Sequence, residues 1–230
     1  MQKTKVVHLT IVHKRYDSRI FCKECISLSE AGYDVSLIVA DGLGNETKQG
    51  VKIIDVGRAE ASRIKRMIRT SRKAVDLALG MNADIYHFHD PDLLIEALRL
   101  RKKACVIFDS HEDFPALMKQ RDYIPDFARK VLFRLCTLIE KYSAKRLSAV
   151  VCATETIQDK FARYGNIRAV VVKNYPVFSS CESETTNSYD TTKPVCYVGG
   201  LTALRGVKEM VEACNKAGVK LLLAGEFDNQ

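Results

Sequence analysis

The sequence predicts an α/β fold: a Rossmann-like parallel sheet with helices on both faces, followed by a partial second Rossmann-like β-α-β unit. Apolar runs of strand length alternate along the chain with segments of helical periodicity, which is typical of a parallel sheet. The strands are apolar on both faces, as expected when helices cover both sides. A polar stretch without periodicity then interrupts the alternation. We therefore predict a first domain over 1–178, a linker over 179–193 and an incomplete second domain over 194–230.

The first strand is predicted at 5–12, a continuous apolar run rich in β-branched residues. Asp17 or Ser18 can cap the following helix, and Gly32 can supply the left-handed residue after its end near Ala31. The other predicted strands are 34–40, 51–56, 84–88, 104–109, 149–153, 169–173, 194–198 and 219–224. The other predicted helices are 61–80, with an apolar stripe, Pro91 to about Arg101, one or more within 124–147, then 154–164 and 206–217. A turn is predicted at 41–45.

The composition is that of an ordinary globular chain. Of 230 residues, 47% are hydrophobic and 28% are charged, which excludes disorder, collagen and coiled coil as descriptions of the whole. No apolar run approaches the ~20 residues of a bilayer crossing, and the basic and then apolar start lacks the cleavage site of a signal peptide. The eight cysteines are scattered, so we expect a reduced, cytoplasmic protein.

Positive charge is concentrated in the first domain. The net charge is +8, and the residues from 179 onward contain seven acidic and five basic side chains, which leaves +10 for the rest. Such a balance suits an anionic partner. The basic helix that carries Arg63, Arg66, Arg69 and Lys73 is either a solvated face or a peripheral contact with anionic lipid at the plasma membrane. Nucleic acid is not expected, because the chain has no Trp and no basic stretch interleaved with aromatics.

Ligands of a parallel α/β sheet bind beyond the carboxyl ends of its strands, so the residues after each strand are the candidate site. No Gly-x-Gly-x-x-Gly follows the first strand, which argues against a nicotinamide or flavin cofactor. His87, His89 and Asp90 lie at the end of the 84–88 strand. They fit three interpretations: metal binding, ordinary strand-end packing, or one polar wall of a substrate cleft.

Two further strand ends carry candidate chemistry. Asp109, His111 and Glu112 form the densest titratable cluster, in which a histidine among carboxylates can bind a hydroxyl or a phosphate. The alternative is a solvated loop with a helix cap. In the second domain, Gly-Gly-Leu-Thr-Ala-Leu-Arg at 199–205 leads into a helix, whose free N–H groups favour phosphate. A plain glycine turn explains that segment equally well.

Five strand-end segments are distinctive when taken together: Val7-His-Leu-Thr with Arg15-Tyr-Asp-Ser-Arg-Ile-Phe, Asp84-Ile-Tyr-His-Phe-His-Asp-Pro, Asp109-Ser-His-Glu-Asp-Phe-Pro, Asn174-Tyr-Pro and Tyr197-Val-Gly-Gly-Leu-Thr. In this order they resemble glycosyltransferase family 4, in particular the bacterial enzymes that build cell-surface polysaccharides. The resemblance implies a GT-B fold with an acceptor-side and a donor-side domain. It also implies a retaining transfer to a saccharide or lipid-linked acceptor, with a nucleotide sugar as co-substrate and no metal or other cofactor.

The resemblance also assigns residues by position. It implies catalytic roles for Asp109, His111 and Glu112, donor-phosphate binding by Gly199, Gly200, Leu201, Thr202 and Arg205, and acceptor binding by Arg15, Tyr16, Asp17, Arg19, His89 and Asp90. Of these, His111 matches the position that reaches the transferred sugar.

Two departures from the family pattern set the limits of this prediction. One of two usual cations of the phosphate loop is replaced by Gly200, and no pair of glutamates is spaced eight apart. We therefore expect the 230-residue chain to be a truncated form with little or no transferase activity. Two alternatives stay open: a non-catalytic module that binds an acceptor or a membrane, and a metal-dependent hydrolase that uses His87, His89 and His111.

Overall fold

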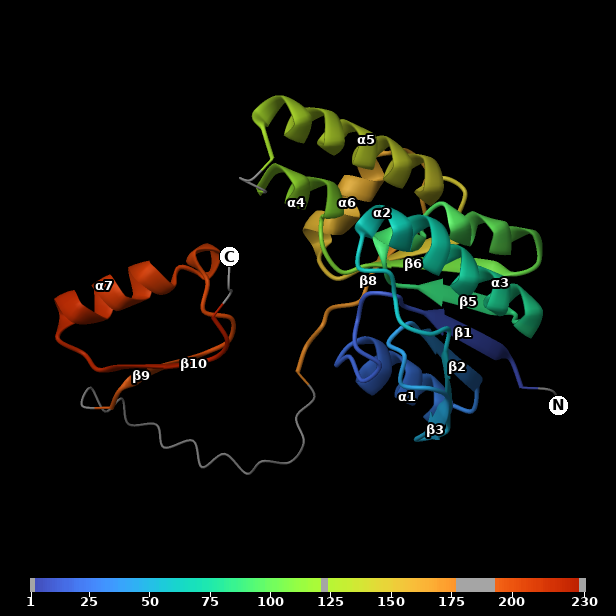
Figure 1. Ribbon diagram of the computed structural model, residues 1–230, viewed down its shortest axis with the longest axis horizontal. Coiled ribbons are helices and arrows are strands. Elements are labelled where there is room, and N and C mark those ends of the chain that lie inside the picture. Colours follow the sequence, from blue (N-terminus) through green and yellow to red (C-terminus); the bar gives the residue numbers. More distant parts are fainter. Residues whose placement is uncertain (1–2, 121–123, 177–192, 228–230) are drawn as a thin grey trace. The chain divides into compact units, whose positions relative to one another are not determined.

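The computed structural model describes residues 3–120, 124–176 and 193–227 (Figure 1). The chain divides into two compact units, Met1–Pro176 and Val177–Gln230. The predicted linker, 179–193, lies outside the described residues except for Lys193.

The first unit is built on an eight-stranded sheet in the order β3-β4-β2-β1-β5-β6-β7-β8. Its strands are β1 (Lys5–Leu9), β2 (Asp34–Val39), β3 (Glu46–Lys48), β4 (Val51–Asp55), β5 (Ile85–Phe88), β6 (Cys105–Ser110), β7 (Ala149–Cys152) and β8 (Ala169–Val171). Neighbouring strands are parallel except β3 and β4, which are antiparallel. The predicted α/β class with a parallel sheet is thereby confirmed.

The antiparallel edge strand β3 was not predicted. It pairs with β4 through a hairpin whose two turn residues, Gln49 and Gly50, both have positive φ (50° and 77°). Two left-handed residues are what a tight hairpin turn requires. Gln-Gly is a weaker sequence signal for such a turn than Asn-Gly, and β3 is only three residues long.

The helical segments of the first unit are interrupted more often than predicted. They are η1 (Ile20–Cys25), α1 (Ile26–Glu30), α2 (Arg63–Lys65), η2 (Arg66–Thr70), α3 (Ser71–Met81), η3 (Pro91–Leu93), η4 (Glu96–Lys102), α4 (Phe114–Leu117), η5 (Met118–Gln120), α5 (Asp126–Ala144) and α6 (Glu155–Arg163). Both η1 and η2 are π-helical, and η3, η4 and η5 are 3-10 turns. The helix predicted after Pro91 is therefore two 3-10 segments.

The sheet has a hydrophobic core on each face. On one face Tyr86, Phe88 and Phe108 pack together with Phe161 of α6 and with residues of α3 and η4. On the other, Ile20 and other apolar residues of η1 pack against β2 and β4. Figure 1 accordingly shows α1 on one side of the sheet and α3, α5 and α6 on the opposite side. No helix among the described residues is long and apolar enough to cross a membrane.

The second unit contains β9 (Val195–Val198), η6 (Ala203–Arg205), α7 (Val207–Ala217) and β10 (Leu221–Ala224). The strands β9 and β10 are parallel neighbours, so the segment is the predicted β-α-β unit. Gly199 and Gly225 follow these strands and approach closely: a Cβ on Gly225 would lie 1.7 Å from the Gly199 carbonyl oxygen. Only glycine fits there without moving the backbone.

Candidate active site

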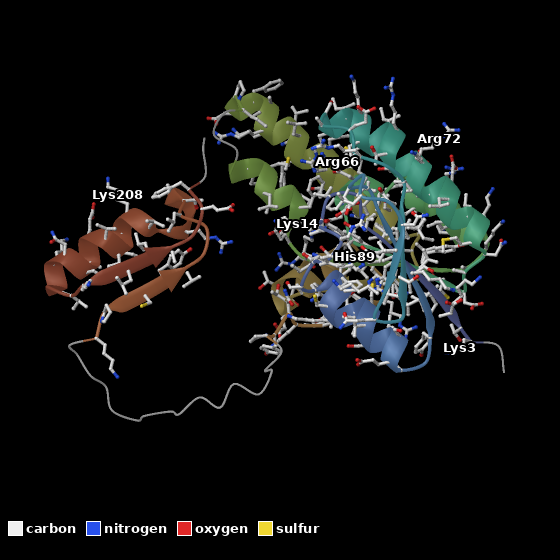
Figure 2. All side chains as sticks on the ribbon, turned by 60° about the horizontal axis from the view of Figure 1, so that its bottom comes forward. Lys3, Lys14, Arg66, Arg72, His89 and Lys208 are labelled. Atoms are coloured by element: carbon white, nitrogen blue, oxygen red, sulfur yellow. The ribbon has the colours of Figure 1, made fainter. Side chains whose placement is uncertain are left out.

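A pocket of about 320 Å³ lies beyond the carboxyl ends of β1, β5 and β6. Apolar side chains line it together with charged and polar ones, and its wall includes His13, Arg63, Arg66, His89, Asp90, Asp92, His111, Glu112 and Phe114. Figure 2 labels His89, which is buried in the first unit, and Arg66 of the basic helix. The sequence thus predicted the edge of the sheet at which the pocket forms, and His89, Asp90, His111 and Glu112 all line it.

Asp90 fixes the loop that follows β1. Its carboxylate accepts hydrogen bonds from the backbone N–H of Ile11 and Val12, from the Thr10 hydroxyl at 3.1 Å and from His13 Nδ1 at 2.8 Å. Burial alone would raise the pKa of Asp90, but the bond from His13 and the backbone donors outweigh it and hold that pKa below its usual range. The same bond raises the pKa of His13. His13 was not predicted as a site residue; only its place after the first strand pointed to it.

Asp109 is the centre of a second network. Arg19 donates to its two oxygens from Nε and Nη2, at 2.8 and 2.9 Å, and His111 Nε2 lies 2.9 Å from Oδ2. His89 Nδ1 lies 3.3 Å from the same oxygen. Burial opposes ionisation, yet the bonds from His111, His89 and Arg19 keep the pKa of Asp109 well below its usual range. The carboxylate therefore holds the His111 ring by Nε2, and Nδ1 has no hydrogen bond within the described part of the chain.

The basic helix contributes to the pocket instead of only facing solvent. Arg63 Nε and Arg66 Nε lie 3.3 and 2.8 Å from the carboxylate of Asp92, which is buried. The Arg63 guanidinium also lies 4.8 Å from the centre of the Phe114 ring. Arg63 and Arg66, two of the four residues considered for a lipid contact, thus form ion pairs with Asp92. Arg69 is exposed and 3.5 Å from Glu60.

The other residues assigned to acceptor binding lie outside the pocket wall. Arg15 is buried and donates to Asp41 at 2.6 and 2.7 Å and to Glu46. Tyr16 donates its hydroxyl to Glu46 at 2.7 Å. Asp17 accepts from the backbone N–H of Arg19 and Ile20, which begins η1. In the structure these side chains hold loops and a helix end, so their assignment to the acceptor rests on the family resemblance alone. Arg19 reaches the site indirectly, through Asp109.

The segment assigned to the donor phosphates lies in the second unit. Leu201 bridges to Phe227, and Thr202 Oγ1 accepts from the Arg205 backbone N–H at 3.2 Å. Gly206 follows in the left-handed conformation, and α7 starts at the next residue without a side-chain cap. Among the described residues, the first N–H groups of α7 therefore have no capping side chain, and phosphate binding at this turn stays a prediction. Gly199 and Gly200 connect β9 to this turn.

The pocket residue His89 also belongs to a group of four polar side chains that converge inside the first unit. The group consists of His8, Glu24, His87 and His89. The strands β1 and β5 pair with His8 opposite His87. Burial raises the pKa of Glu24 to about 9, with the charge of Asp109 adding to it, and burial lowers the pKa of His87 to about 3. His8 and Glu24 were not predicted as site residues. The three histidines of the hydrolase alternative are split between this group and a second one, His89, Asp109 and His111.

Comparison with known families gives one match. The family model described as Glycosyltransferase Family 4 matches residues 23–174, which is more than half of the chain. A comparison with curated proteins found no match.

Solved structures share the fold at low sequence identity. Sucrose-phosphate synthase from Thermosynechococcus elongatus superposes with a TM-score of 0.68 and 14% identity, covering 99% of this chain and 64% of that one. The catalytic domain of starch synthase IV from Arabidopsis thaliana, bound to ADP and acarbose, gives 0.60 and 11%, with 98% and 69% covered. Anabaena HepE in complex with UDP and glucose gives 0.52 and 11%, with 97% and 70% covered. The chain spans just under two thirds of the length of the sucrose-phosphate synthase chain.

Proposed function

The chain belongs to glycosyltransferase family 4, and from this premise we propose that the whole protein transfers a sugar from a nucleotide-sugar donor to a saccharide or lipid-linked acceptor with retention of configuration. The acceptor occupies the pocket of the first unit, and the donor diphosphate binds the glycine-rich turn of the second. The bound nucleotides named for the starch synthase and HepE structures support a nucleotide-linked donor.

The observation that carries this proposal is the His111–Asp109–Arg19 arrangement at the pocket wall. Arg19 holds the Asp109 carboxylate with two hydrogen bonds, and Asp109 in turn fixes the His111 ring. The ring is oriented before any ligand arrives, so binding a sugar hydroxyl through Nδ1 costs little reorganisation. His111 then orients the transferred sugar and does not serve as a general base.

The demanding event of the reaction is departure of the diphosphate. The bond from the anomeric carbon to the diphosphate oxygen breaks, a bond to the acceptor oxygen forms on the same face, and the acceptor proton passes to the departing diphosphate. Negative charge grows on the leaving group, and N–H groups and cations aimed at it lower the barrier. Arg205 and the uncapped N-terminus of α7 are the groups that supply this in the second unit.

The test is a transfer assay on the protein at its full natural length. A panel of nucleotide sugars is offered with saccharide and lipid-linked acceptors, and the products are identified by mass spectrometry and their anomeric configuration by NMR. We expect His111→Ala to lower kcat/KM by about 10²-fold or more, the usual cost of a lost transition-state contact. Arg99→Ala is the matched control, because Arg99 pairs with Asp76 and Glu96 on the surface. No transfer with any donor, or full activity of His111→Ala, would refute the proposal.

A peripheral membrane contact is a second element of the proposal, and a specific observation favours it. The helix α5 exposes an apolar stripe: Phe127, Val131, Leu135, Leu138 and Tyr142, with Phe127 81% and Leu138 64% exposed. The exposed basic residues Lys130, Arg134 and Lys145 belong to the same helix or follow it. Apolar and cationic side chains on one helix suit an anionic lipid surface. This moves the expected contact from Arg63 and Arg66 to α5, with Arg69 and Lys73 left as secondary sites.

Sedimentation with vesicles of anionic or neutral phospholipid tests this contact separately from catalysis. We expect the wild type to sediment with anionic vesicles at low salt and Phe127→Glu/Leu138→Glu to stay in solution, while Arg63→Ala changes little. Equal sedimentation of all three proteins would exclude the α5 contact. It would leave the transferase proposal untouched.

A further inference from the structure

We propose that His8, Glu24, His87 and His89 form a site for one divalent transition-metal ion, of the zinc class, inside the first unit. The four potential ligand atoms lie within 4.8 Å of one another. His8 Nδ1 and His89 Nε2 are 3.0 Å apart, and each lies 3.9 Å from Glu24 Oε2, as does His87 Nδ1. A tetrahedral ion with bonds of about 2.1 Å separates its ligand atoms by about 3.4 Å, which falls within this spread.

The carboxyl group of Glu24 is a polar group of this cluster that the described residues leave unsatisfied, whereas His8 Nδ1 and His89 Nε2 lie at hydrogen-bond distance from each other. Neither oxygen of Glu24 accepts a hydrogen bond among the described residues, although Arg19 Nε lies 3.1 Å from Oε1 as an ion pair. The Nε2 atoms of His8 and His87 also lack a hydrogen-bond partner among the described residues, but an ion in this cluster would bind these two rings at Nδ1 and would leave their Nε2 atoms unchanged. Buried polar groups in folded proteins are nearly always bonded, and a buried carboxylate without donors is especially costly. Three imidazole nitrogens facing that carboxylate cannot all donate to it at 3.9 Å, but all four atoms can bind a cation.

The charged groups around the cluster also favour a bound cation. Two carboxyl groups, the buried Asp109 and Glu24, whose oxygens are buried, share one guanidinium, that of Arg19. Lys23, next in sequence to Glu24, is engaged elsewhere, donating to Asn174 and to the Tyr175 carbonyl. A divalent cation at the cluster gives the Glu24 carboxylate a positively charged partner of its own.

The surroundings have the further features expected of a metal site. His89 offers Nε2 to the cluster while its Nδ1 faces Asp109 at 3.3 Å, the carboxylate–histidine–metal arrangement that fixes a ligand's orientation. A cavity of about 470 Å³ is lined by Glu24 and His87, whose side chains are 16% and 12% exposed, and gives an ion a route of entry. Three imidazoles and one carboxylate match the ligand preference of zinc.

Four protein ligands close the coordination sphere, so the ion has a structural role and takes no part in transfer. It joins η1, which carries Glu24, to β1 and β5, and it holds His89 beside Asp109. This inference is independent of the proposed function, because neither the donor nor the acceptor enters it.

The experiment measures metal content and unfolding temperature of the full chain. Protein purified without chelator and dialysed is assayed by mass spectrometry for zinc, manganese, cobalt and nickel. We expect about one zinc per chain, lost in His87→Gln and in Glu24→Gln and kept in His13→Gln, the matched substitution at a histidine outside the cluster. EDTA lowers the unfolding temperature of the wild type, and added Zn²⁺ restores it.

Three results would overturn the proposal. The first is a wild type that binds no metal stoichiometrically and whose unfolding temperature changes with neither EDTA nor Zn²⁺. This result can be obtained even if a variant fails to fold. The second is a His87→Gln protein that keeps its ion. The third is loss of the ion in His111→Gln together with its retention in Glu24→Gln, which would assign it to the group of His89, Asp109 and His111.

Discussion

Two polar networks share the interior of the first unit, and they differ in how well they are satisfied. Around Asp109, each carboxylate oxygen receives at least one charge-assisted hydrogen bond. Glu24, whose side chain is 16% exposed against 0% for Asp109, receives none among the described residues. Both carboxyl groups lie beside the same arginine, Arg19. The hydrogen bonds of the first network hold His111 and Asp109 in place with protein groups alone, whereas the second is the network to which we assign a metal ion.

Removing the centre of the satisfied network is the strongest way to break this contrast. Asp109→Ala leaves the buried Arg19 with the contact to Glu24 at 3.1 Å and the hydrogen bond to the Val172 carbonyl but removes its two hydrogen bonds to Asp109. We therefore expect the free energy of unfolding to fall by about 3 kcal/mol. Urea denaturation followed by circular dichroism measures it. The double variant Arg19→Met/Asp109→Leu removes both charges and should recover much of the loss. A single variant as stable as wild type would mean that the pair is solvated in solution.

The unsatisfied network should respond in the opposite sense. In protein stripped of metal, Glu24→Gln removes a group whose ionised form is disfavoured by burial in the folded state and introduces an amide that can donate to an imidazole nitrogen, so we expect a gain of about 2 kcal/mol in unfolding free energy. In metal-loaded protein the same substitution removes a ligand and should lower the unfolding temperature. The sign change between the two conditions, read by differential scanning calorimetry, is the diagnostic result. A loss of stability in both conditions would contradict the comparison.

Asp90 is another buried carboxylate whose partners are within the protein, and the pH dependence of stability tests its hydrogen bond to His13. Because its bond to Asp90 raises the pKa of His13, the charged form is stabilised in the folded state. This contribution is fully present below the unfolded pKa of about 6.5 and is lost as the pH rises through the folded pKa of His13. His13→Gln should therefore cost about 1 kcal/mol at pH 5.5 and less at pH 9. Imidazole NMR titration checks the pKa directly, and a value at or below 6.5 would count against the interpretation.

Much of the fold was predictable because each strand carries its own signal. Apolar runs and turn residues placed seven strands of the first unit, and the carboxyl-end rule brought His89, Asp90, His111 and Glu112 to one pocket. The exception, β3, depends on a hairpin turn at Gln49-Gly50 that local sequence signals only weakly.

The partners of those residues were not predictable, since they come from other elements. His8 is opposite His87 only because of the register of β1 on β5, and Glu24 reaches both from a π-helical turn. Likewise, Arg63 and Arg66 look like a solvated basic face in the sequence, and only the position of η3 brings Asp92 to them. Sequence periodicity gives the face of an element, but pairing across elements needs the three-dimensional register.

The smallest expected effect concerns an exposed ion pair, and it shows whether burial or charge determines how much Asp109 contributes to stability. Lys52 and Asp34 form an ion pair at 2.9 Å, a distance similar to that between Arg19 and Asp109, but their side chains are 58% and 31% exposed. Water screens both ions in the folded and unfolded states, so Asp34→Asn should change the unfolding free energy by at most about 0.5 kcal/mol. The same urea titration used for Asp109→Ala measures it. A loss as large as that of Asp109→Ala would show that the short contact itself, and not its removal from water, determines what these carboxylates contribute.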